Sequence, residues 1–396
     1  MTRCIGYLSG APRVTTRQDG ESGGARSHVL GVMGAYRHLG WDVRPYIYGD
    51  LIDLNTRAGS AIKSVFQNSH IGRAAADLGR IALGRKSADA AYRQIGPSIQ
   101  YAYERYAIFQ ALGRPFKQRG IPWILETQGL FYYEARFERK SISFSKLAKR
   151  LELAAYHDAD VIIAVTQVLK DLLVKEANVP EHKILVIPNG VDTNKFQPME
   201  QGAKRSSRPL LGFVGGLLRW QGIDLLLTAI AKARDLGADY DALIVGDGEE
   251  RANLERLASE LGLADRVHFA GRVDGDRVPD YIRQFDICFS GQLPSKIGGM
   301  YHSPLKIYEY MAMARPVLAS GFSDARSVID GKGTGFLFEA GNVDSLVTRL
   351  IEVHSLAEAL PDMGRRARDE IVRHHSWNTR VAGMIEQIDR RLASRG

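Results

Sequence analysis

The fold is decided by the stretch Leu210-Leu211-Gly212-Phe213-Val214-Gly215-Gly216-Leu217-Leu218-Arg219-Trp220-Gln221-Gly222-Ile223-Asp224. Its first five residues predict a strand buried on both faces, because the apolar residues are continuous rather than alternating. The amphipathic stretch Ile223–Leu236 that follows predicts a helix. Ligands of a parallel sheet bind beyond the carboxyl ends of the strands, so the glycine pair faces that edge. There Arg219 could hold a diphosphate by paired hydrogen bonds, or it could be a plain surface charge.

The same order of apolar run and helical segment recurs along the chain. Further amphipathic stretches are His28–Leu39 and Glu249–Leu261. An alternation of strands and helices predicts an α/β fold with parallel sheets covered on both sides. The other predicted strands are Cys4–Leu8, Val43–Tyr48, Trp123–Glu126, Val161–Val165, Ile184–Ile187, Ala242–Val245, Val267–Phe269, Ile287–Ser290 and Val317–Ser320.

The length of 396 residues suits two domains. Pro188-Asn189-Gly190 is a turn signal, and the polar residues 197–208 are typical of a linker. We therefore expect an N-terminal domain of residues 1–190 and a C-terminal domain that begins at residue 191.

Composition argues for a soluble protein in a reducing compartment. Cys4 and Cys288 form no CxxC pair, so we expect two buried thiols and a cytoplasmic location. The sequence has no run of 18 apolar residues, and its N-terminus predicts a strand rather than a signal peptide.

Positive charge is concentrated in the first half. Residues 1–190 carry an excess of nine positive charges, whereas the remainder carries one excess negative charge. Such asymmetry favours an anionic partner or is simply a solvated basic surface. Nucleic acid is the less favoured partner, because no reading module is present.

Residues 136–150 are the most basic segment, with Arg136, Arg139, Lys140, Lys146, Lys149 and Arg150. Phe144, Leu147, Leu151 and Ala154 have helical spacing, so part of the segment predicts an amphipathic helix. We expect it to make peripheral contact with an anionic membrane or to meet a lipid-diphosphate acceptor. The alternative is a helix that packs on its own domain with a hydrated basic face.

Three further segments could bind a ligand. Gly20-Glu21-Ser22-Gly23-Gly24 precedes a helix and either approaches a phosphate or forms a surface turn. Val245-Gly246-Asp247-Gly248 follows a strand, and Asp247 lines the sheet edge or caps the next helix. In Ser303-Pro304-Leu305-Lys306-Ile307-Tyr308-Glu309-Tyr310-Met311-Ala312, Pro304 suits the first turn of a helix.

Lys306 and Glu309 are three residues apart, so they share one face of that helix. A cation for phosphate and a carboxylate for ribose hydroxyls suit a nucleotide site, and the alternative is a surface salt bridge. Asp274-Gly275-Asp276 resembles a metal-binding DxD motif, but its glycine-rich turn favours an ordinary loop.

These segments, in this order, resemble the retaining GT-B glycosyltransferases of family 4. The similarity is strongest in Pro188-Asn189-Gly190-Val191-Asp192, residues 213–224, residues 245–248, and Ser303–Ala312 followed by Arg315-Pro316-Val317. Tyr103-Glu104-Arg105-Tyr106 and Ile124-Leu125-Glu126 are similar to the bacterial polysaccharide branch of that family.

The resemblance implies two Rossmann-like domains that face each other across a cleft. The first would bind the acceptor, residues 191–375 would bind a UDP- or GDP-sugar, and residues 376–396, with Trp377, would cross back as a helix. It implies no metal and no cofactor besides the nucleotide-sugar co-substrate. The diphosphate would then be neutralised by cations and helix N-termini.

By position, the resemblance assigns residues to roles. The catalytic residues would be Gln128, Arg219 and Lys306, and Glu309 would hold the ribose. The other donor-binding residues would be Gly23, Gly24, Gly215, Gly216, Asp247, Gly248, Arg272, Tyr301, His302, Ser303, Pro304 and Leu305.

The sequence departs from the family pattern at four positions. Tyr301 stands where the first Glu of the Glu-x7-Glu motif is usual, and Gly216 and Gln221 replace the Arg and Lys of the glycine loop. Gln128 stands at a frequent histidine position. Its amide can hydrogen-bond a sugar hydroxyl but cannot act as a general base.

The resulting hypothesis is sugar transfer to a lipid-linked or glycan acceptor in cell-surface polysaccharide biosynthesis, at the cytoplasmic face of the membrane. The alternatives are glycosylation of a small natural product, a sugar-nucleotide 2-epimerase of the same fold, and a catalytically silent nucleotide-binding module.

Overall fold

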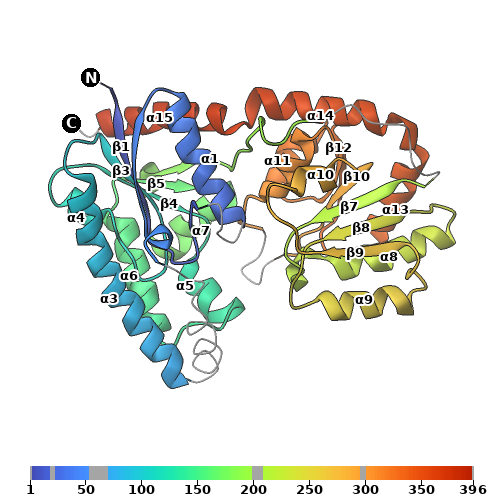
Figure 1. The fold of residues 1–396 in the computed structure, drawn as a ribbon, viewed down its shortest axis with the longest axis horizontal. Coiled ribbons are helices and arrows are strands. Elements are labelled where there is room, and N and C mark those ends of the chain that lie inside the picture. The colour runs from blue at the N-terminus through green and yellow to red at the C-terminus, as the bar shows by residue number, and fades with distance from the viewer. Residues whose placement is uncertain (1, 18–22, 53–69, 199–207, 295–299, 395–396) are drawn as a thin grey trace. The chain divides into compact units, whose positions relative to one another are not determined.

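The computed structural model describes residues 2–17, 23–52, 70–198, 208–294 and 300–394. The chain divides into two compact units, one of residues 1–188 with 380–396 and one of residues 189–379 (Figure 1). Gly20, Glu21 and Ser22 of the predicted glycine-rich segment lie outside the described residues, as does most of the predicted linker, residues 199–207.

The first unit contains a parallel sheet with the strand order β2-β1-β3-β4-β5-β6. Ile5 pairs with Val43 on one side and with Tyr101 on the other, so the strand order reverses at the first strand. The strands are β1 (Cys4–Ser9), β2 (Asp42–Ile47), β3 (Tyr101–Arg105), β4 (Trp123–Thr127), β5 (Val161–Ala164) and β6 (Ile184–Val186).

Helices cover this sheet because its strands are apolar on both faces. One face packs against α3 (His70–Ile95) and α4 (Arg114–Lys117), through residues such as Leu8, Ile95 and Phe116. The end of the chain also belongs to this unit, since Met384 Sδ lies 3.6 Å from the Tyr103 hydroxyl. The remaining helical segments are α1 (Gly24–His38), η1 (Tyr48–Asp50), α5 (Phe131–Tyr133), η2 (Glu134–Glu138), α6 (Ser145–Asp158), α7 (Gln167–Ala177), η3 (Glu181–Lys183) and α15 (Trp377–Ala393).

The second unit repeats the architecture with the strand order β12-β11-β10-β7-β8-β9. Its strands are all parallel to their neighbours, and the order reverses between β7 and β10. The strands are β7 (Leu210–Val214), β8 (Asp241–Val245), β9 (Val267–Gly271), β10 (Ile287–Ser290), β11 (Val317–Ser320) and β12 (Gly335–Phe338).

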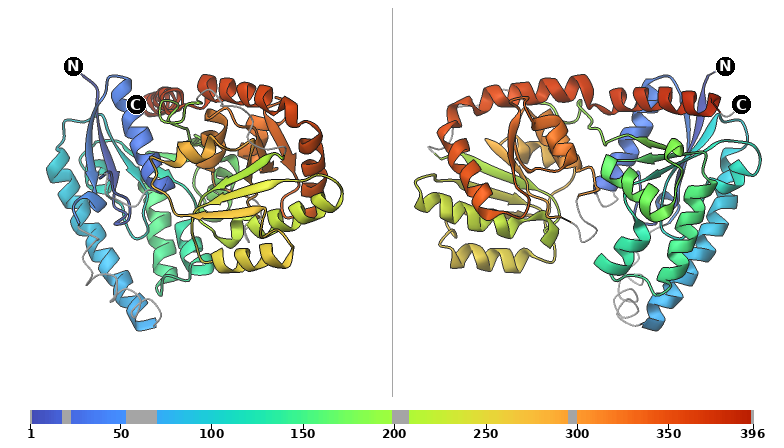
Figure 2. Two further views of the ribbon diagram at one scale, coloured as in Figure 1. Left: turned by 45° about the vertical axis from the view of Figure 1, so that its right-hand side comes forward. Right: turned by 180° about the vertical axis from the view of Figure 1, so that it is seen from behind.

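The second sheet has a core on each face. Leu211 and Phe213 point to the face covered by α8 (Ile223–Asp235) and α13 (Val343–Ser355). Cys288 points to the opposite face, where α11 (Leu305–Ala312) and α14 (Leu360–His374) pack (Figure 1, and from behind in Figure 2). The other helical segments are η4 (Arg219–Gln221), α9 (Arg251–Glu260), α10 (Val278–Ile282), α12 (Ser323–Ile329) and η5 (Ala357–Ala359).

The structure confirms every predicted strand to within two residues and both predicted buried thiols. It adds β3, β12 and α3, which the sequence patterns did not predict. Of the helices in the described part of the chain, none combines the length and apolar character needed to span a bilayer.

Candidate functional site

The strand-order reversal between β7 and β10 marks the carboxyl edge where an open α/β sheet binds ligands. The loop after β7 carries Gly215 and Gly216, and the loop after β8 carries Gly246 and Gly248. Leu217 N donates to the Asp247 carbonyl over 3.0 Å, so the two loops are tied together. The sequence predicted both loops at this edge, and the structure brings them into contact.

Close packing explains the glycines of these loops. A Cβ on Gly246 would lie 1.9 Å from the Gly215 carbonyl oxygen, and Gly246 has a φ of +136°. A Cβ on Gly248 would lie 2.3 Å from the Leu217 carbonyl oxygen. Only glycine therefore lets the two backbones approach this closely.

Lys306 extends from α11 to the loop after β7. Its Nζ donates to Gln221 Oε1 over 2.6 Å and lies 4.1 Å from the centre of the Phe213 ring. A Cβ on Gly215 would be 3.0 Å from this Nζ. Burial lowers the pKa of Lys306 to about 7, because the charged form loses hydration without gaining a bonded carboxylate.

Glu309 lies one turn further along α11 and is only partly exposed. Burial raises its pKa to about 7, although Lys195 and Lys306 act in the opposite direction. The described side chains of Lys306 and Glu309 form no ion pair, so the surface-salt-bridge interpretation of this pair is wrong. Together they give the edge a cation and a carboxylate whose charges respond to pH near neutrality.

The loop before α11 is anchored by Asn189. Asn189 N donates to Ser303 Oγ over 3.0 Å, and Asn189 Nδ2 donates to the Ser303 carbonyl over 2.7 Å. Tyr301 is buried and its ring lies 4.3 Å from that of His302. Because Asn189 is buried, it fixes the entry into α11 from the turn that the sequence placed at the domain boundary.

Two local predictions are wrong. Pro304 is the N-cap residue of α11, one position before the first turn, and Leu305 begins the helix. Asp247 does not cap α9, which begins at Arg251; its carboxylate instead accepts from Gly248 N over 2.8 Å within the loop.

The two remaining cations of the predicted donor site are exposed. Arg219 begins η4 in the loop after β7, next to the glycine pair. Arg272 follows β9, two strands away from β7, so the sheet places it apart from Lys306. Asp274 and Asp276 lie in the loop after β9 as predicted, where Asp276 pairs with Lys195 at 2.8 Å.

In the first unit, Gly23 is the N-cap of α1 and Gly24 is its first residue. Gln128 follows β4, and its Nε2 donates to Glu126 Oε1. His28 of α1 meets the same carboxylate oxygen at 2.8 Å, and the Tyr103 hydroxyl donates to Glu126 Oε2 over 2.5 Å. The structure thus assembles a buried charged cluster beneath the partly exposed Gln128.

Glu126 is the centre of this cluster. Burial by itself would raise its pKa, but the ion pair with His28 and the other hydrogen bonds hold the pKa below its ordinary value. Sequence patterns do not reveal His28 as a partner of Gln128, because the two residues are 100 positions apart. Two features of the sequence could have indicated this cluster. His28 lies in the first turns of a predicted helix that follows glycines, and Glu126 is a carboxylate at the end of a predicted strand.

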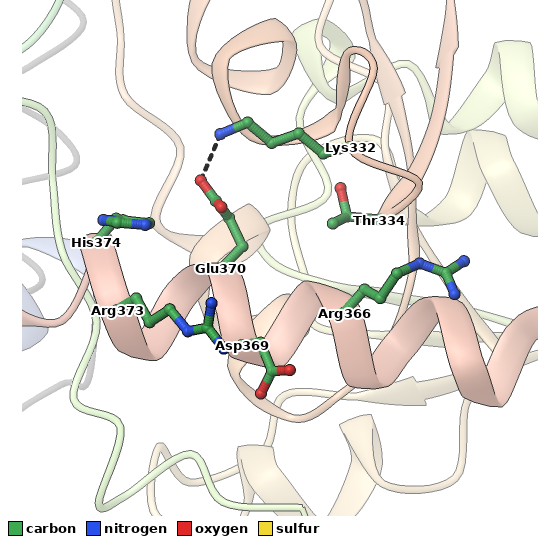
Figure 3. Close-up of a pocket in the computed structure, with 7 residues that line it drawn as sticks. All are labelled: Lys332, Thr334, Arg366, Asp369, Glu370, Arg373 and His374. Carbon is green, nitrogen blue, oxygen red and sulfur yellow. Dashed lines mark hydrogen bonds and ion pairs between the residues drawn. The ribbon is translucent and has the colours of Figure 1, made fainter.

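A pocket of about 240 Å³ lies elsewhere on the second unit (Figure 3). It is formed by α14 and the loop before β12, at the amino end of that strand, and contains the ion pair of Lys332 with Glu370. None of the predicted site residues lines it. Its lining residues are Lys332, Thr334, Arg366, Asp369, Glu370, Arg373 and His374.

Two family models match consecutive parts of the chain. The model of Glycosyltransferase Family 4 matches residues 22–195, and the model of Glycosyl transferases group 1 matches residues 194–370. The boundary between the matches coincides with the start of the second unit to within a few residues.

Curated relatives share about a quarter to a third of the aligned residues. The 2-deoxystreptamine glucosyltransferase of Streptomyces kanamyceticus is 29% identical over 60% of this chain and 63% of its own length. The UDP-Gal:alpha-D-GlcNAc-diphosphoundecaprenol alpha-1,3-galactosyltransferase of Escherichia coli is 30% identical over 64% of this chain and 65% of its own. The chain therefore spans slightly less than two thirds of the length of these relatives.

Solved structures share the fold over the whole chain. Sucrose-phosphate synthase of Thermosynechococcus elongatus superimposes with a TM-score of 0.72 at 18% identity and full coverage of both chains. HepE of Anabaena, in complex with UDP, superimposes with a TM-score of 0.66 at 18% identity, covering 98% of this chain and 100% of the HepE chain. Since the family models account for both halves of the sequence and the fold is that of GT-B enzymes, the chain belongs to the family 4 glycosyltransferases.

Proposed function

We propose that this protein transfers a sugar from a UDP- or GDP-sugar to a lipid-linked or glycan acceptor. The observation that carries the proposal is the meeting of Lys306 with the Gly215 loop at the strand-order reversal. A nucleoside diphosphate needs a cation and closely approaching backbone amides at such an edge. These groups stabilise the negative charge that develops on the diphosphate as its bond to the sugar breaks.

In the proposed reaction the bond between the sugar's anomeric carbon and the β-phosphate oxygen breaks. A new bond forms to an acceptor hydroxyl oxygen, and the hydroxyl proton passes to the departing phosphate. Lys306 and Arg219 would hold the diphosphate, with the backbone of Gly215 and Gly216 beside it, and Glu309 would bind the ribose hydroxyls. Gln128 would hydrogen-bond a sugar hydroxyl, with its amide nitrogen committed to Glu126.

The nucleotide is identified by ranking the thermal shifts caused by UDP, GDP, ADP and TDP. A ligand stabilises the folded protein by mass action, so the preferred nucleotide raises the melting temperature most. Glu309→Gln should reduce that rise, because the amide loses the charged acceptor for ribose hydroxyls. No shift with any of the four would contradict the proposed donor site.

Transfer is tested by incubation with UDP- and GDP-sugars, with and without acceptor. Nucleotide released only with acceptor supports transfer. Interconversion of the sugar without acceptor would support a 2-epimerase instead, and tight binding without turnover would support a silent nucleotide-binding module.

The lipid-linked acceptor is favoured by the basic segment of residues 136–150. Its six arginines and lysines are all exposed, and Phe137 and Leu147 are exposed among them. Arg136 lies over the Phe137 ring and Lys149 over the Tyr132 ring, at 4.7 and 5.3 Å. Basic and apolar side chains side by side suit an anionic lipid surface, and the Escherichia coli relative is named for a diphosphoundecaprenol acceptor.

Vesicle sedimentation tests this surface. Binding to phosphatidylglycerol vesicles should exceed binding to phosphatidylcholine vesicles and should weaken with salt, with each basic residue contributing about 1 kcal/mol. The triple variant Lys146→Glu, Lys149→Glu, Arg150→Glu should lose this binding. Three charge reversals on the second unit, Lys232→Glu, Arg256→Glu and Arg373→Glu, are the matched control.

Equal binding by the two triple variants would argue against membrane contact through residues 136–150. A small natural product would then be the favoured acceptor, as in the Streptomyces kanamyceticus relative named for 2-deoxystreptamine. Transfer to water-soluble aminocyclitols, compared with transfer to undecaprenyl-diphosphate sugars, decides between the two acceptor classes.

A further inference from the structure

One tryptophan differs from the others in its exposure. All four tryptophans lie in the described part of the chain, and Trp41, Trp123 and Trp377 are at most 7% exposed, whereas Trp220 is 43% exposed. Burying such a ring would stabilise the fold by about 1.5–3 kcal/mol, so its exposure beside the predicted donor residues calls for a reason.

The position of Trp220 is fixed by the two loops that flank the strand-order reversal. Its carbonyl accepts a hydrogen bond from Leu293 N over 2.8 Å, which ties the loop after β7 to the loop after β10. A Cβ on Gly222 would lie 2.3 Å from the Gly291 carbonyl oxygen, so the loops are also in close contact there. The next residue, Gln221, is the hydrogen-bond partner of Lys306.

Trp220 also has aromatic neighbours. The centre of its ring lies 6.2 Å from that of His302, and the His302 ring lies 4.3 Å from that of the buried Tyr301. The exposed indole of Trp220 therefore lies next to the His302 ring, which in turn contacts the buried ring of Tyr301. Such a surface is rigid, because tryptophan has only two side-chain torsions to order.

The order of residues in α11 and in the loop before it indicates which part of a nucleotide sugar would reach this surface. In the proposed function Glu309 binds ribose and Lys306 binds the diphosphate. His302 lies in the loop before α11, which begins at Leu305, so along the chain it is on the side of Lys306 away from Glu309. A ligand that runs from Glu309 past Lys306 would therefore present its sugar, not its base, to His302 and Trp220.

We propose that Trp220 and His302 form a stacking platform for a sugar ring, an inference that rests on the proposed function. A pyranose has an apolar C–H face and a rim of hydroxyls. The indole face covers the C–H face, while the indole N–H donates a hydrogen bond to a hydroxyl. The ring is that of the donor sugar or that of a sugar acceptor, and both share this chemistry.

Fluorescence quenching provides a direct test, because Trp220 is the exposed indole. Acrylamide should quench wild-type emission mainly through Trp220, and Trp220→Phe should lose most of the quenchable emission. The test compares acrylamide quenching in the presence of UDP, GDP, UDP-glucose, GDP-mannose, and methyl α-glucoside with and without UDP. Protection by a nucleotide sugar beyond that given by its free nucleotide identifies the donor sugar, and protection by the glucoside identifies an acceptor sugar.

Two outcomes would overturn the platform. One is equal protection by a free nucleotide and its sugar conjugate, which would assign Trp220 to the nucleotide. The other is protection by none of the sugar ligands. A failure of the proposed function is separate, because in that case none of the nucleotides shifts the melting temperature.

Kinetics gives a second readout. Trp220→Ala should raise KM for the sugar-bearing substrate about threefold to tenfold, as expected for loss of an aromatic contact. Trp220→Phe should restore most of the loss. The thermal shift caused by UDP alone should stay at its wild-type value in both variants. A reduced UDP shift in Trp220→Ala would instead indicate a structural role in the loop.

Discussion

Lys306 Nζ donates a 2.6 Å hydrogen bond to Gln221 Oε1, across 85 residues of sequence. A neutral amide is a weak partner for a buried ammonium group, so the lysine is held in place without being fully compensated. An arriving diphosphate would supply the missing negative charge.

Lys306→Ala should weaken binding of the preferred nucleotide about 10- to 100-fold, the usual effect of losing a hydrogen bond between charged groups. Isothermal titration calorimetry measures the affinity directly. Lys232→Ala is the control, because Lys232 is an exposed lysine of the same unit that pairs with Asp344. Equal affinities of the Lys306 variant and the wild type would remove Lys306 from the donor site.

Nucleotide affinity should fall as the pH rises above about 7. The pKa of Lys306 is about 7 in the free protein, and a bound diphosphate would raise it, so binding takes up a proton above that pH. Ionisation of Glu309, whose pKa is also about 7, supplies the charged acceptor for the ribose hydroxyls over the same range and therefore opposes this fall. Calorimetry in buffers of different ionisation enthalpy measures the proton uptake.

The two contributions can be separated by substitution. Lys306→Arg keeps its charge at all these pH values, so it should abolish the lysine's share of the uptake. Glu309→Gln should abolish the opposing contribution of the carboxylate. A Glu309→Gln variant whose nucleotide affinity is constant between about pH 6 and 9 would contradict the assignment of Lys306 to the site.

Gly246→Ala should destabilise the second unit by about 2 kcal/mol or more, because the new Cβ meets the Gly215 carbonyl oxygen at 1.9 Å at a φ of +136°. Chemical denaturation measures the loss. Gly34→Ala is the control: Gly34 lies in α1 with nothing within 4 Å of its Cβ position, so alanine should stabilise by about 0.5–1 kcal/mol. If Gly246→Ala left the stability unchanged, the loops after β7 and β8 would be shown to separate without cost.

His28→Ala should destabilise the first unit by about 1–3 kcal/mol at neutral pH, because it removes a hydrogen-bond partner of the buried Glu126 carboxylate. The pKa of Glu126 is held below its ordinary value, so its pairing stabilises the fold above about pH 4.5 and this stabilisation is lost as the pH falls. The loss of stability caused by His28→Ala should therefore become smaller as the pH falls.

Adding Glu126→Gln to His28→Ala should recover part of the loss at neutral pH, since no buried charge is left unpaired. Denaturant titrations of the single and double variants between acid and neutral pH measure this. An equal effect of Glu126→Gln on stability in the wild type and in His28→Ala would show that Glu126 and His28 are not coupled in the folded protein.

The sequence was informative where a feature depends on neighbouring residues. Continuous apolar runs predicted β7, β10 and β11 to the residue, and the glycines after β7 and β8 predicted two loops at the carboxyl edge. It failed for β3, because Glu104 gives that strand a polar appearance. Only the fold supplies Leu112 N and Gly113 N, which donate to the Glu104 carboxylate over 2.9 and 2.8 Å.

By itself, then, the sequence determined the order of strands, glycine loops and helices, and with it the edge of each sheet where function resides. Only the tertiary structure decided that Gln221 would meet Lys306, that His28 would pair with Glu126, and that Trp220 would stand exposed beside His302. The physical reason is range: periodicity and turn preference act over a few residues, whereas burial and charge pairing depend on groups that folding brings together from distant positions.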